Sequence, residues 1–246
     1  MNNLYTNTFS TINVRKNMSP RSEVITQIIY GDSFLVLKNN KNWWKIKIQE
    51  DGYIGFIKKK NFLKYIKPTH KVNIISANIY REKNLSKIIG SIPFGSKIRA
   101  KKVNSRFIKF EKKLIKIKDV QSIDSKNTDI FSKIKMFKGK KYKWGGKTYK
   151  GIDCSALVQI FFNFNNKFCP RDAKDQIKFF KKNIKLDKIK KNDIIYWKGH
   201  VAVALSKDKL IHAYGPMKKT VIMNIKKTIK IIKKTARLEV LSIKRP

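Results

Sequence analysis

The sequence predicts an α+β protein, with small β modules in its first half and a mixed domain in its second half. Three observations support this. Residues 10–67 read as short strands between tight turns, residues 69–120 repeat that texture weakly, and helical patterns followed by strand patterns come after a polar segment, residues 121–128. Strands and helices segregated along a chain are typical of α+β folds. The expected domains are 1–67, 68–122 and 123–246.

The first module is predicted from alternation and turn chemistry. Ile12 and Val14 alternate with polar residues, and further strands are expected at Phe34–Leu37, Trp44–Ile48 and Tyr53–Ile57. The dipeptide at 51–52, Asp-Gly, is a strong hairpin signal between the last two. Several short strands with tight turns indicate a small barrel.

The second module looks like a degraded copy of the first, displaced by about 64 residues. Residues 77–80 stand where the first module has 12–15, and Lys97–Ala100 stands where it has its Phe34 strand. Phe107–Phe110 and Leu114–Ile117 complete the predicted strands. The copy lacks the tryptophan pair and the D-G-Y-I-G turn, so the repeat is a weaker prediction than the first module.

The third region combines helical and strand patterns. Helical spacing is found at 129–137, an almost unbroken apolar run at Ser155–Phe164 predicts a buried helix, and Arg171–Lys182 predicts a more polar one. Three strands of one antiparallel sheet are expected at Ile194–Trp197, Val201–Leu205 and Leu210–Tyr214. A last strand is expected at Leu238–Ile243.

Charge is the most unusual feature of the composition. The chain has 58 Lys and Arg against 16 Asp and Glu, a formal net charge of +42. Such a charge is typical of proteins that bind nucleic acids or anionic surfaces. Only eight residues are Arg, however, and Lys, Asn and Ile, which share AT-rich codons, are all abundant along the whole chain. Codon bias is therefore the preferred explanation of the charge, and no specific nucleic-acid partner is expected.

Cysteine and histidine counts limit the chemistry. Two cysteines, Cys154 and Cys169, do not make a disulfide framework. With three histidines and no C-x-x-C spacing, neither a metal site nor a cofactor is expected.

The first residues lack the apolar run of a signal peptide, and no stretch is long and apolar enough for a membrane span. A cytoplasmic protein is the expectation, with export by another route left open.

Cys154 is the candidate nucleophile. It follows a glycine-containing loop and Asp153, and the predicted apolar helix begins just after it. A helix N-terminus favours a thiolate, and its free N–H groups can stabilise an oxyanion. A small buried cysteine is the alternative reading. Cys169, before Pro170, has no comparable setting and is interpreted as structural.

Two of the three histidines fall in one predicted hairpin. His200 opens one strand and His212 lies on the next, so both rings can reach the same side of the sheet. A base together with a group that orients it is the arrangement of catalytic triads. His70, between the two β modules, is interpreted as a surface or domain-contact residue.

These motifs together resemble the NlpC family of papain-like cell-wall peptidases. The resemblance rests on Y-x-W-G-G at 142–146, G-I-D-C-S at 151–155, P-R-D-x-x-x-Q at 170–176, D-I-I-Y-W-K-G-H at 193–200 and L-I-H-A at 210–213. Gly31, Trp44 and D-G-Y-I-G-F at 51–56 resemble bacterial SH3-like domains. The resemblance implies a papain-like catalytic domain behind two SH3-like barrels.

The resemblance also implies roles for individual residues. Cys154 corresponds to the nucleophile, His200 to the base and His212 to the residue that orients it.

The resemblance implies five substrate-binding positions, some at the active-site mouth and some beside the nucleophile: Tyr142, Asp153, Ser155, Trp144 and Trp197. Loop capping at the helix start is the alternative for Asp153 and Ser155. Arg171 and Asp172 are interpreted as a structural turn and ion pair. Ala156 departs from the glycine usual in the family.

The implied function is cleavage of the γ-D-glutamyl–diamino acid bond in peptidoglycan stem peptides. The lack of a signal peptide favours released muropeptides and recycling over intact wall. Two alternatives remain: a related thiol amidase or acyltransferase on another substrate, and a non-catalytic basic binding module. The fold alone does not distinguish the peptidase from the first of these alternatives.

Overall fold

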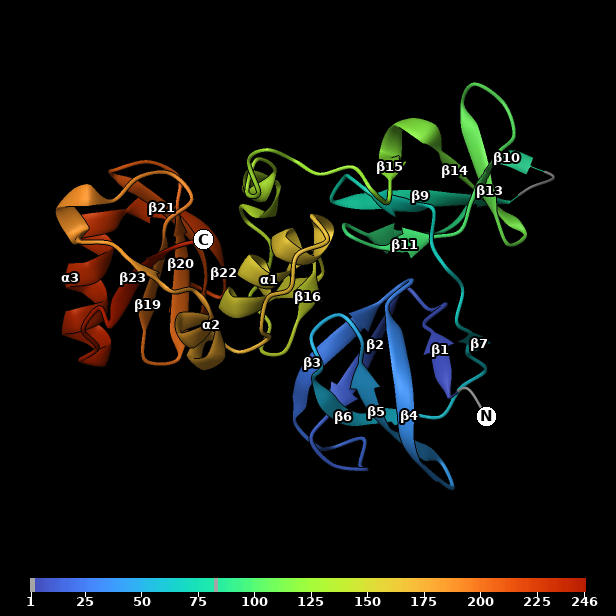
Figure 1. Cartoon of the computed structure of the whole chain (residues 1–246), viewed down its shortest axis with the longest axis horizontal. Coiled ribbons are helices and arrows are strands. Elements are labelled where there is room, and N and C mark those ends of the chain that lie inside the picture. Colours follow the sequence, from blue (N-terminus) through green and yellow to red (C-terminus); the bar gives the residue numbers. More distant parts are fainter. Residues whose placement is uncertain (1–2, 82–83) are drawn as a thin grey trace. The chain divides into compact units, whose positions relative to one another are not determined.

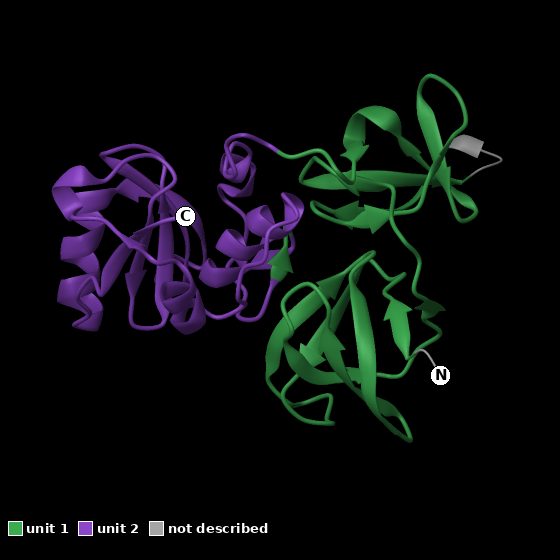
Figure 2. Cartoon of the chain, in the orientation of Figure 1, with its two compact units in different colours: residues 1–126, 147–149 green, residues 127–146, 150–246 purple. Residues whose placement is uncertain are grey.

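The computed structural model describes residues 3–81 and 84–246, with backbone only at 84–86. The chain divides into two compact units (Figure 2). The first comprises residues 1–126 and 147–149, and the second comprises residues 127–146 and 150–246. No helix in the described ranges is long and apolar enough to cross a membrane.

The first β module forms a seven-stranded sheet in the order β3-β2-β6-β5-β4-β1-β7. Its strands are β1 (Leu4–Thr6), β2 (Thr11–Arg15), β3 (Val24–Ile29), β4 (Ser33–Asn40), β5 (Trp43–Ile48), β6 (Ile54–Lys58) and β7 (Leu63–Lys64). Alternate residues of β2 and β5, such as Val14 and Ile46, are buried in one apolar cluster. Trp44 lies in this cluster against the rings of Tyr5 and Phe62. The four strands predicted from the sequence are therefore all present.

Gly31 occupies a turn that no other residue fits. Its φ is +84°, and a Cβ atom there would lie 2.0 Å from the carbonyl oxygen of Lys97 in the second module. The neighbouring Tyr30 carbonyl accepts a hydrogen bond from the Lys97 amide at 2.9 Å. The backbones of the two modules thus approach closely because residue 31 has no side chain.

We expect Gly31→Ala to lower the free energy of unfolding of the first unit more than Gly52→Ala does. Both positions have positive φ, but a Cβ at Gly52 would meet only the flexible end of Lys47, at 3.7 Å. The difference should therefore reflect the clash with Lys97, and overpacking of this kind costs about 1–3 kcal/mol. Calorimetric unfolding of both variants measures it. Equal shifts for the two variants would contradict the close approach.

The second β module has two small sheets, ordered β10-β9-β14-β13-β12 and β11-β8-β15. The strands are β8 (His70–Val72), β9 (Ser76–Arg81), β10 (Asn84–Pro93), β11 (Lys97–Ile98), β12 (Lys101–Lys102), β13 (Phe107–Phe110), β14 (Lys113–Lys116) and β15 (Val120–Ser122), with a 3-10 turn η1 (Ile117–Asp119). Ala77 and Ile79 are buried in the core, as Ile12 and Val14 are in the first module. His70 begins β8 and hydrogen-bonds the Thr69 hydroxyl.

The second unit is built on a six-stranded antiparallel sheet in the order β18-β23-β19-β20-β21-β22. The strands are β18 (Lys182–Asn183), β19 (Ile194–Trp197), β20 (His200–Ala204), β21 (Lys209–Tyr214), β22 (Lys219–Asn224) and β23 (Ser242–Arg245). The helices are α1 (Cys154–Phe164), α2 (Ala173–Phe179) and α3 (Ile225–Ala236). Shorter elements are β16 (Lys147–Thr148), β17 (Gly151–Ile152), η2 (Ile134–Phe137), η3 (Leu186–Lys188) and η4 (Gly215–Met217).

Helices α1 and α3 lie on either side of this sheet (Figure 1). Ile195 and Trp197 of β19 share one core cluster with Ile225 and Ile232 of α3. Helix α1 packs against β20 and β21 and is buried along almost its whole length. The α+β prediction is therefore confirmed, and the start of α1 is held against the strands that carry both candidate histidines.

The sequence analysis was wrong about several elements of this unit. It missed α3, whose buried Ile225, Thr228 and Ile232 have helical spacing but stand among lysines. Residues 129–137 form only the 3-10 turn η2 rather than a helix, since Phe137 is followed by a turn at Gly139 with φ +78°. Helix α2 is shorter than Arg171–Lys182 because Arg171 is drawn into a buried ion pair before the helix begins.

Candidate active site

The loop before Cys154 is shaped by Asp153. The Asp153 carboxylate caps α1, accepting hydrogen bonds from the backbone amides of Ala156 at 2.8 Å and Gly145 at 2.9 Å. The loop is tight, since a Cβ at Gly146 would lie 2.4 Å from the Gly151 carbonyl oxygen. Cys154 is thereby fixed as the first residue of α1, as the sequence predicts within one residue.

Arg171 forms a buried ion pair with the same carboxylate. Its guanidinium donates to Asp153 Oδ1 at 3.0 Å and Oδ2 at 2.5 Å, and to the Ser155 hydroxyl at 2.9 Å. Arg171 is 3% exposed and Asp153 5% exposed. The polar atoms of Asp153 and Ser155 are thus engaged within the protein, which is the loop-capping arrangement rather than an open substrate contact.

The Cys154 thiol lies in a buried environment. Burial, with the Asp153 carboxylate beside it, raises the pKa of Cys154 to about 12, against the opposing effects of the Val201 and Ser155 backbone amides and of Arg171. Burial thus opposes the stabilisation of a thiolate that is expected from the helix N-terminus. The thiol needs a base to remove its proton. Cys169 is also buried and is not in a disulfide.

The structure brings His200 and His212 together. Leu210 of β21 lies opposite Ala204 of β20, and the even spacing from these residues to the two histidines puts both rings on one face of the sheet. His200 Nε2 and His212 Nδ1 are 2.8 Å apart. Tyr214 stacks on the His212 ring with centroids 4.6 Å apart, so the second imidazole is held in place.

The contact between the rings determines which nitrogen of His200 is available. Nε2 is occupied by His212, so Nδ1 is the atom left to act as a base. With Nδ1 unprotonated, Nε2–H donates to His212 Nδ1, and His212 carries its own proton on Nε2, 3.4 Å from the Met223 sulfur. Because Val201 N–H hydrogen-bonds the Cys154 thiol, the thiol lies one residue from His200 along β20.

Both histidines are neutral over a wide pH range. Burial lowers the pKa of His200 to about 4, and burial together with His200 lowers the pKa of His212 to about 3. A neutral His200 accepts a proton, whereas a protonated one does not. The Cys154 thiol and the His200 imidazole are therefore both uncharged near neutral pH.

We expect any activity of this site to persist well below the ordinary histidine pKa. Since the pKa of His200 is lowered, its base form remains as pH falls until about pH 4, and the rate then decreases with one proton taken up. A pH profile of kcat/KM measures this, with circular dichroism at each pH to exclude unfolding. An acid limb at about pH 6.5 or higher would contradict it.

The aromatic residues expected around the site differ in burial. Tyr142 is partly buried, and its pKa is raised by burial and by the nearby Cys154 and Asp153, which puts it beside the thiol. Trp197 is buried in the core with its ring 5.6 Å from that of His200, so it supports the base and cannot contact a substrate. Trp144 is 60% exposed.

Sequence reasoning missed two residues that hold His212. Tyr214 could have been found, because it stands two residues after His212 on the same strand and so on the same face. Met223 comes from β22, and only the pairing of β22 with β21 brings it near. Among the described residues no group of three or more His, Cys, Asp or Glu side chains could hold a metal ion.

Comparison with known proteins gives matches to both halves of the chain. Residues 139–236 match the NlpC/P60 family, and residues 14–62 match the family described as the bacterial dipeptidyl-peptidase Sh3 domain. Dipeptidyl-peptidase 6 of Lysinibacillus sphaericus is 39% identical over 72 residues, 29% of this chain and 27% of that protein. Gamma-DL-glutamyl hydrolase of Bacillus subtilis is 29% identical over 120 residues, 45% of this chain and 29% of that protein. The chain thus spans less than a third of either relative.

The fold also matches a solved structure over its full length. An NlpC/P60 family protein from Bacillus cereus superposes with a TM-score of 0.84, covering 98% of this chain and 99% of that one, at 16% identity. At this identity the match establishes the fold, including the β modules before the mixed unit. Residues of the second β module, 68–122, lie outside the Sh3 match.

Proposed function

Residues 139–236 form an NlpC/P60 domain, and from this premise we propose that the chain is a cysteine peptidase of peptidoglycan. It hydrolyses the γ-D-glutamyl–diamino acid amide bond of stem peptides, with Cys154, His200 and His212 as its catalytic residues. Relatives support this: one is named a gamma-DL-glutamyl hydrolase and another a probable endopeptidase.

The observation that carries the proposal is the alignment of three groups on adjoining elements. A cysteine begins a buried helix, the strand facing it begins with a histidine, and a second histidine lies 2.8 Å from the far nitrogen of the first. This is the arrangement of nucleophile, base and orienting group that acyl transfer requires.

The reaction proceeds in two stages. His200 Nδ1 takes the Cys154 proton as the sulfur attacks the γ-amide carbonyl, and the backbone N–H groups at the start of α1 stabilise the oxyanion. His200 then protonates the leaving amine of the diamino acid, which leaves a thioester on Cys154. Water, deprotonated by His200, hydrolyses the thioester and regenerates the thiol. His212 keeps His200 in the required tautomer throughout.

The substrate is a stem peptide or a released muropeptide. Tyr142, beside the thiol, is the residue placed to contact the peptide near the scissile bond. Asp153 and Ser155 shape the site through Arg171 and the loop rather than by direct contact. Every proton transfer in the scheme has a residue of this chain to perform it.

The test is mass spectrometry of L-Ala-γ-D-Glu-meso-diaminopimelate incubated with the full chain. Release of L-Ala-γ-D-Glu and free diaminopimelate is the expected result, and intact sacculi run in parallel show whether free peptide or wall is preferred. Protein alkylated with iodoacetamide is the control and should release nothing. Absence of cleavage of both substrates by a folded protein with a reactive Cys154 would overturn the proposal in favour of another acyl substrate.

A further inference from the structure

The second β module carries an aromatic cluster outside its core. Its sheet buries one face in the module's main cluster through residues such as Ile79, Ile108 and Ile115. Side chains alternate along strands, and the residues of opposite parity form a separate cluster on the other face: Tyr80, Phe107 and Leu114.

A groove of about 600 Å³ adjoins the outer cluster. It is lined by one aromatic pair, three cationic side chains and two further residues: Tyr80, Phe107, Arg106, Lys116, Lys118, Ser105 and Ile117. The Lys116 ammonium lies 5.4 Å from the centre of the Tyr80 ring. Asp119 is the neighbouring acid, and its pKa is raised by burial while Lys118 and Lys116 act against that rise. Among the described residues that line the groove three are cationic and none is acidic, so the lining favours anions.

The size and lining of the groove are those of a small-molecule site. Such sites are mostly apolar, of about 300–1,000 Å³, with a few polar groups that fix the ligand. Arg106 supplies the planar fork that binds phosphate or carboxylate with two hydrogen bonds. The apolar wall of the groove suits a ligand that also has a nonpolar face.

We propose that this groove binds an acidic saccharide, a sugar unit that carries a phosphate or a carboxylate. Arg106, Lys116 and Lys118 bind the anionic group, and the apolar wall formed by Tyr80, Phe107 and Ile117 contacts the C–H face of the sugar ring. This site is separate from the thiol site and does not depend on the proposed peptidase activity. It gives the second module, which lacks the hallmarks of the first, a binding role of its own.

The geometry of the rings favours a saccharide over a nucleic acid. Tyr80 and Phe107 meet edge to face, with centroids 5.5 Å apart and planes at 80°. They are only 7% and 8% exposed. Proteins that bind single-stranded nucleic acids present open ring faces on which successive bases stack. With so little of either ring exposed, neither presents an open face on which bases could stack.

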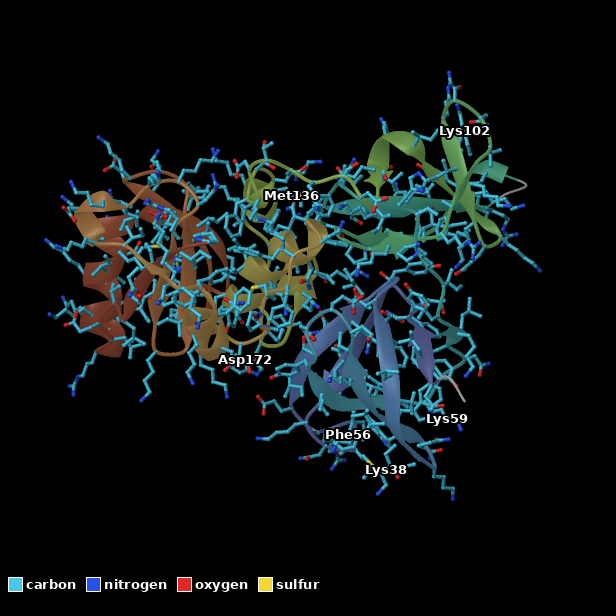
Figure 3. All side chains as sticks on the ribbon, viewed as in Figure 1. Lys38, Phe56, Lys59, Lys102, Met136 and Asp172 are labelled. Atoms are coloured by element: carbon cyan, nitrogen blue, oxygen red, sulfur yellow. The ribbon has the colours of Figure 1, made fainter. Side chains whose placement is uncertain are left out.

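Diffuse charge is the main competing explanation for any binding of anions. Side-chain nitrogen atoms project from every part of the ribbon, and the labelled Lys38 on the first module and Lys102 on the second both point outward (Figure 3). A matched control is therefore needed. Lys38, Lys41 and Lys58 are exposed on the first module, and replacing them removes the same three charges.

The experiment is an NMR titration of the full-length protein with N-acetylglucosamine 6-phosphate, N-acetylmuramic acid and neutral N-acetylglucosamine. We expect shifts of the Tyr80 and Phe107 ring signals with both acidic sugars, and affinity at least about tenfold weaker for the neutral sugar. The triple variant Arg106→Ala, Lys116→Ala, Lys118→Ala should lose about tenfold or more in affinity. The control triple Lys38→Ala, Lys41→Ala, Lys58→Ala should not.

Three results would overturn the proposal. An equal loss of affinity for the acidic sugars in the two triple variants would show that binding depends only on net charge. Inorganic phosphate binding as tightly as the sugar phosphate would leave an ion site without a sugar contact. If a short oligo-dT binds more tightly than the acidic sugars, and only the groove triple variant loses that binding, the ligand of the groove is a nucleic acid. Preference for the phosphate or the carboxylate sugar tells which anionic group the groove selects.

Discussion

Replacing Cys154 with Ala should abolish hydrolysis of the γ-glutamyl tripeptide, with a fall in kcat of at least about 10⁴-fold. The sulfur is the atom that forms the thioester, and Ala156 and the Asp153 cap keep the helix start intact without it. Binding of the peptide should be nearly unchanged, because the variant keeps every group around the thiol. Single-turnover kinetics and equilibrium binding on the same preparation measure both quantities.

Cys169→Ala is the matched control for this variant. Both cysteines are buried and neither is in a disulfide, so both substitutions remove one sulfur from a packed interior. The Cys169 thiol donates to the Pro170 carbonyl at 3.6 Å. The control should keep its activity and lose only a little stability. Loss of activity in both variants, or in Cys169→Ala alone, would mean that the nucleophile has been misassigned.

The position of the thiol was predictable because its signals are local. A glycine-rich loop, an N-cap Asp and an apolar run are contiguous in sequence, and they place Cys154 at the start of α1. The ionisation of that thiol was not predictable. It depends mainly on the burial of Cys154, which a sequence pattern does not measure.

For the two histidines as well, one part of the arrangement was predictable from local sequence and another part depends on tertiary structure. Their presence on consecutive strands followed from alternation and a turn signal. The contact between His200 Nε2 and His212 Nδ1, and so the choice of Nδ1 as the base, follows from strand register. A shift of one residue would put the two rings on opposite faces of the sheet.

Helix α3 was missed for a compositional reason. Ile225, Thr228 and Ile232 mark its buried side, and the Asn224 side chain caps it by accepting from the Lys227 amide at 3.0 Å. These signals are short and stand in a lysine-rich segment that resembles the rest of this chain. Where one residue type is abundant everywhere, an exposed helix face is hard to distinguish from a loop.

Arg171→Met should be the most destabilising single change in the second unit, lowering its free energy of unfolding by about 3–5 kcal/mol. The Asp153 carboxylate would remain buried with its Gly145 and Ala156 amide partners but without a countercharge. Urea denaturation followed by amide hydrogen exchange in α1 measures the loss within this unit. The same variant should also lose activity, since Asp153 fixes the loop before Cys154.

A second substitution separates the unpaired charge from the lost packing. Asp153→Asn keeps a side-chain oxygen for the Ala156 amide, and Asn is as good an N-cap as Asp. In the double variant Arg171→Met, Asp153→Asn no buried charge remains, so stability should recover by a large part of the single-variant loss. If the double variant is as unstable as Arg171→Met, the ion pair contributes through shape and hydrogen bonds rather than charge. Recovery of stability without recovery of activity would show that the Arg171 fork is needed to hold the Cys154 loop in its reactive geometry.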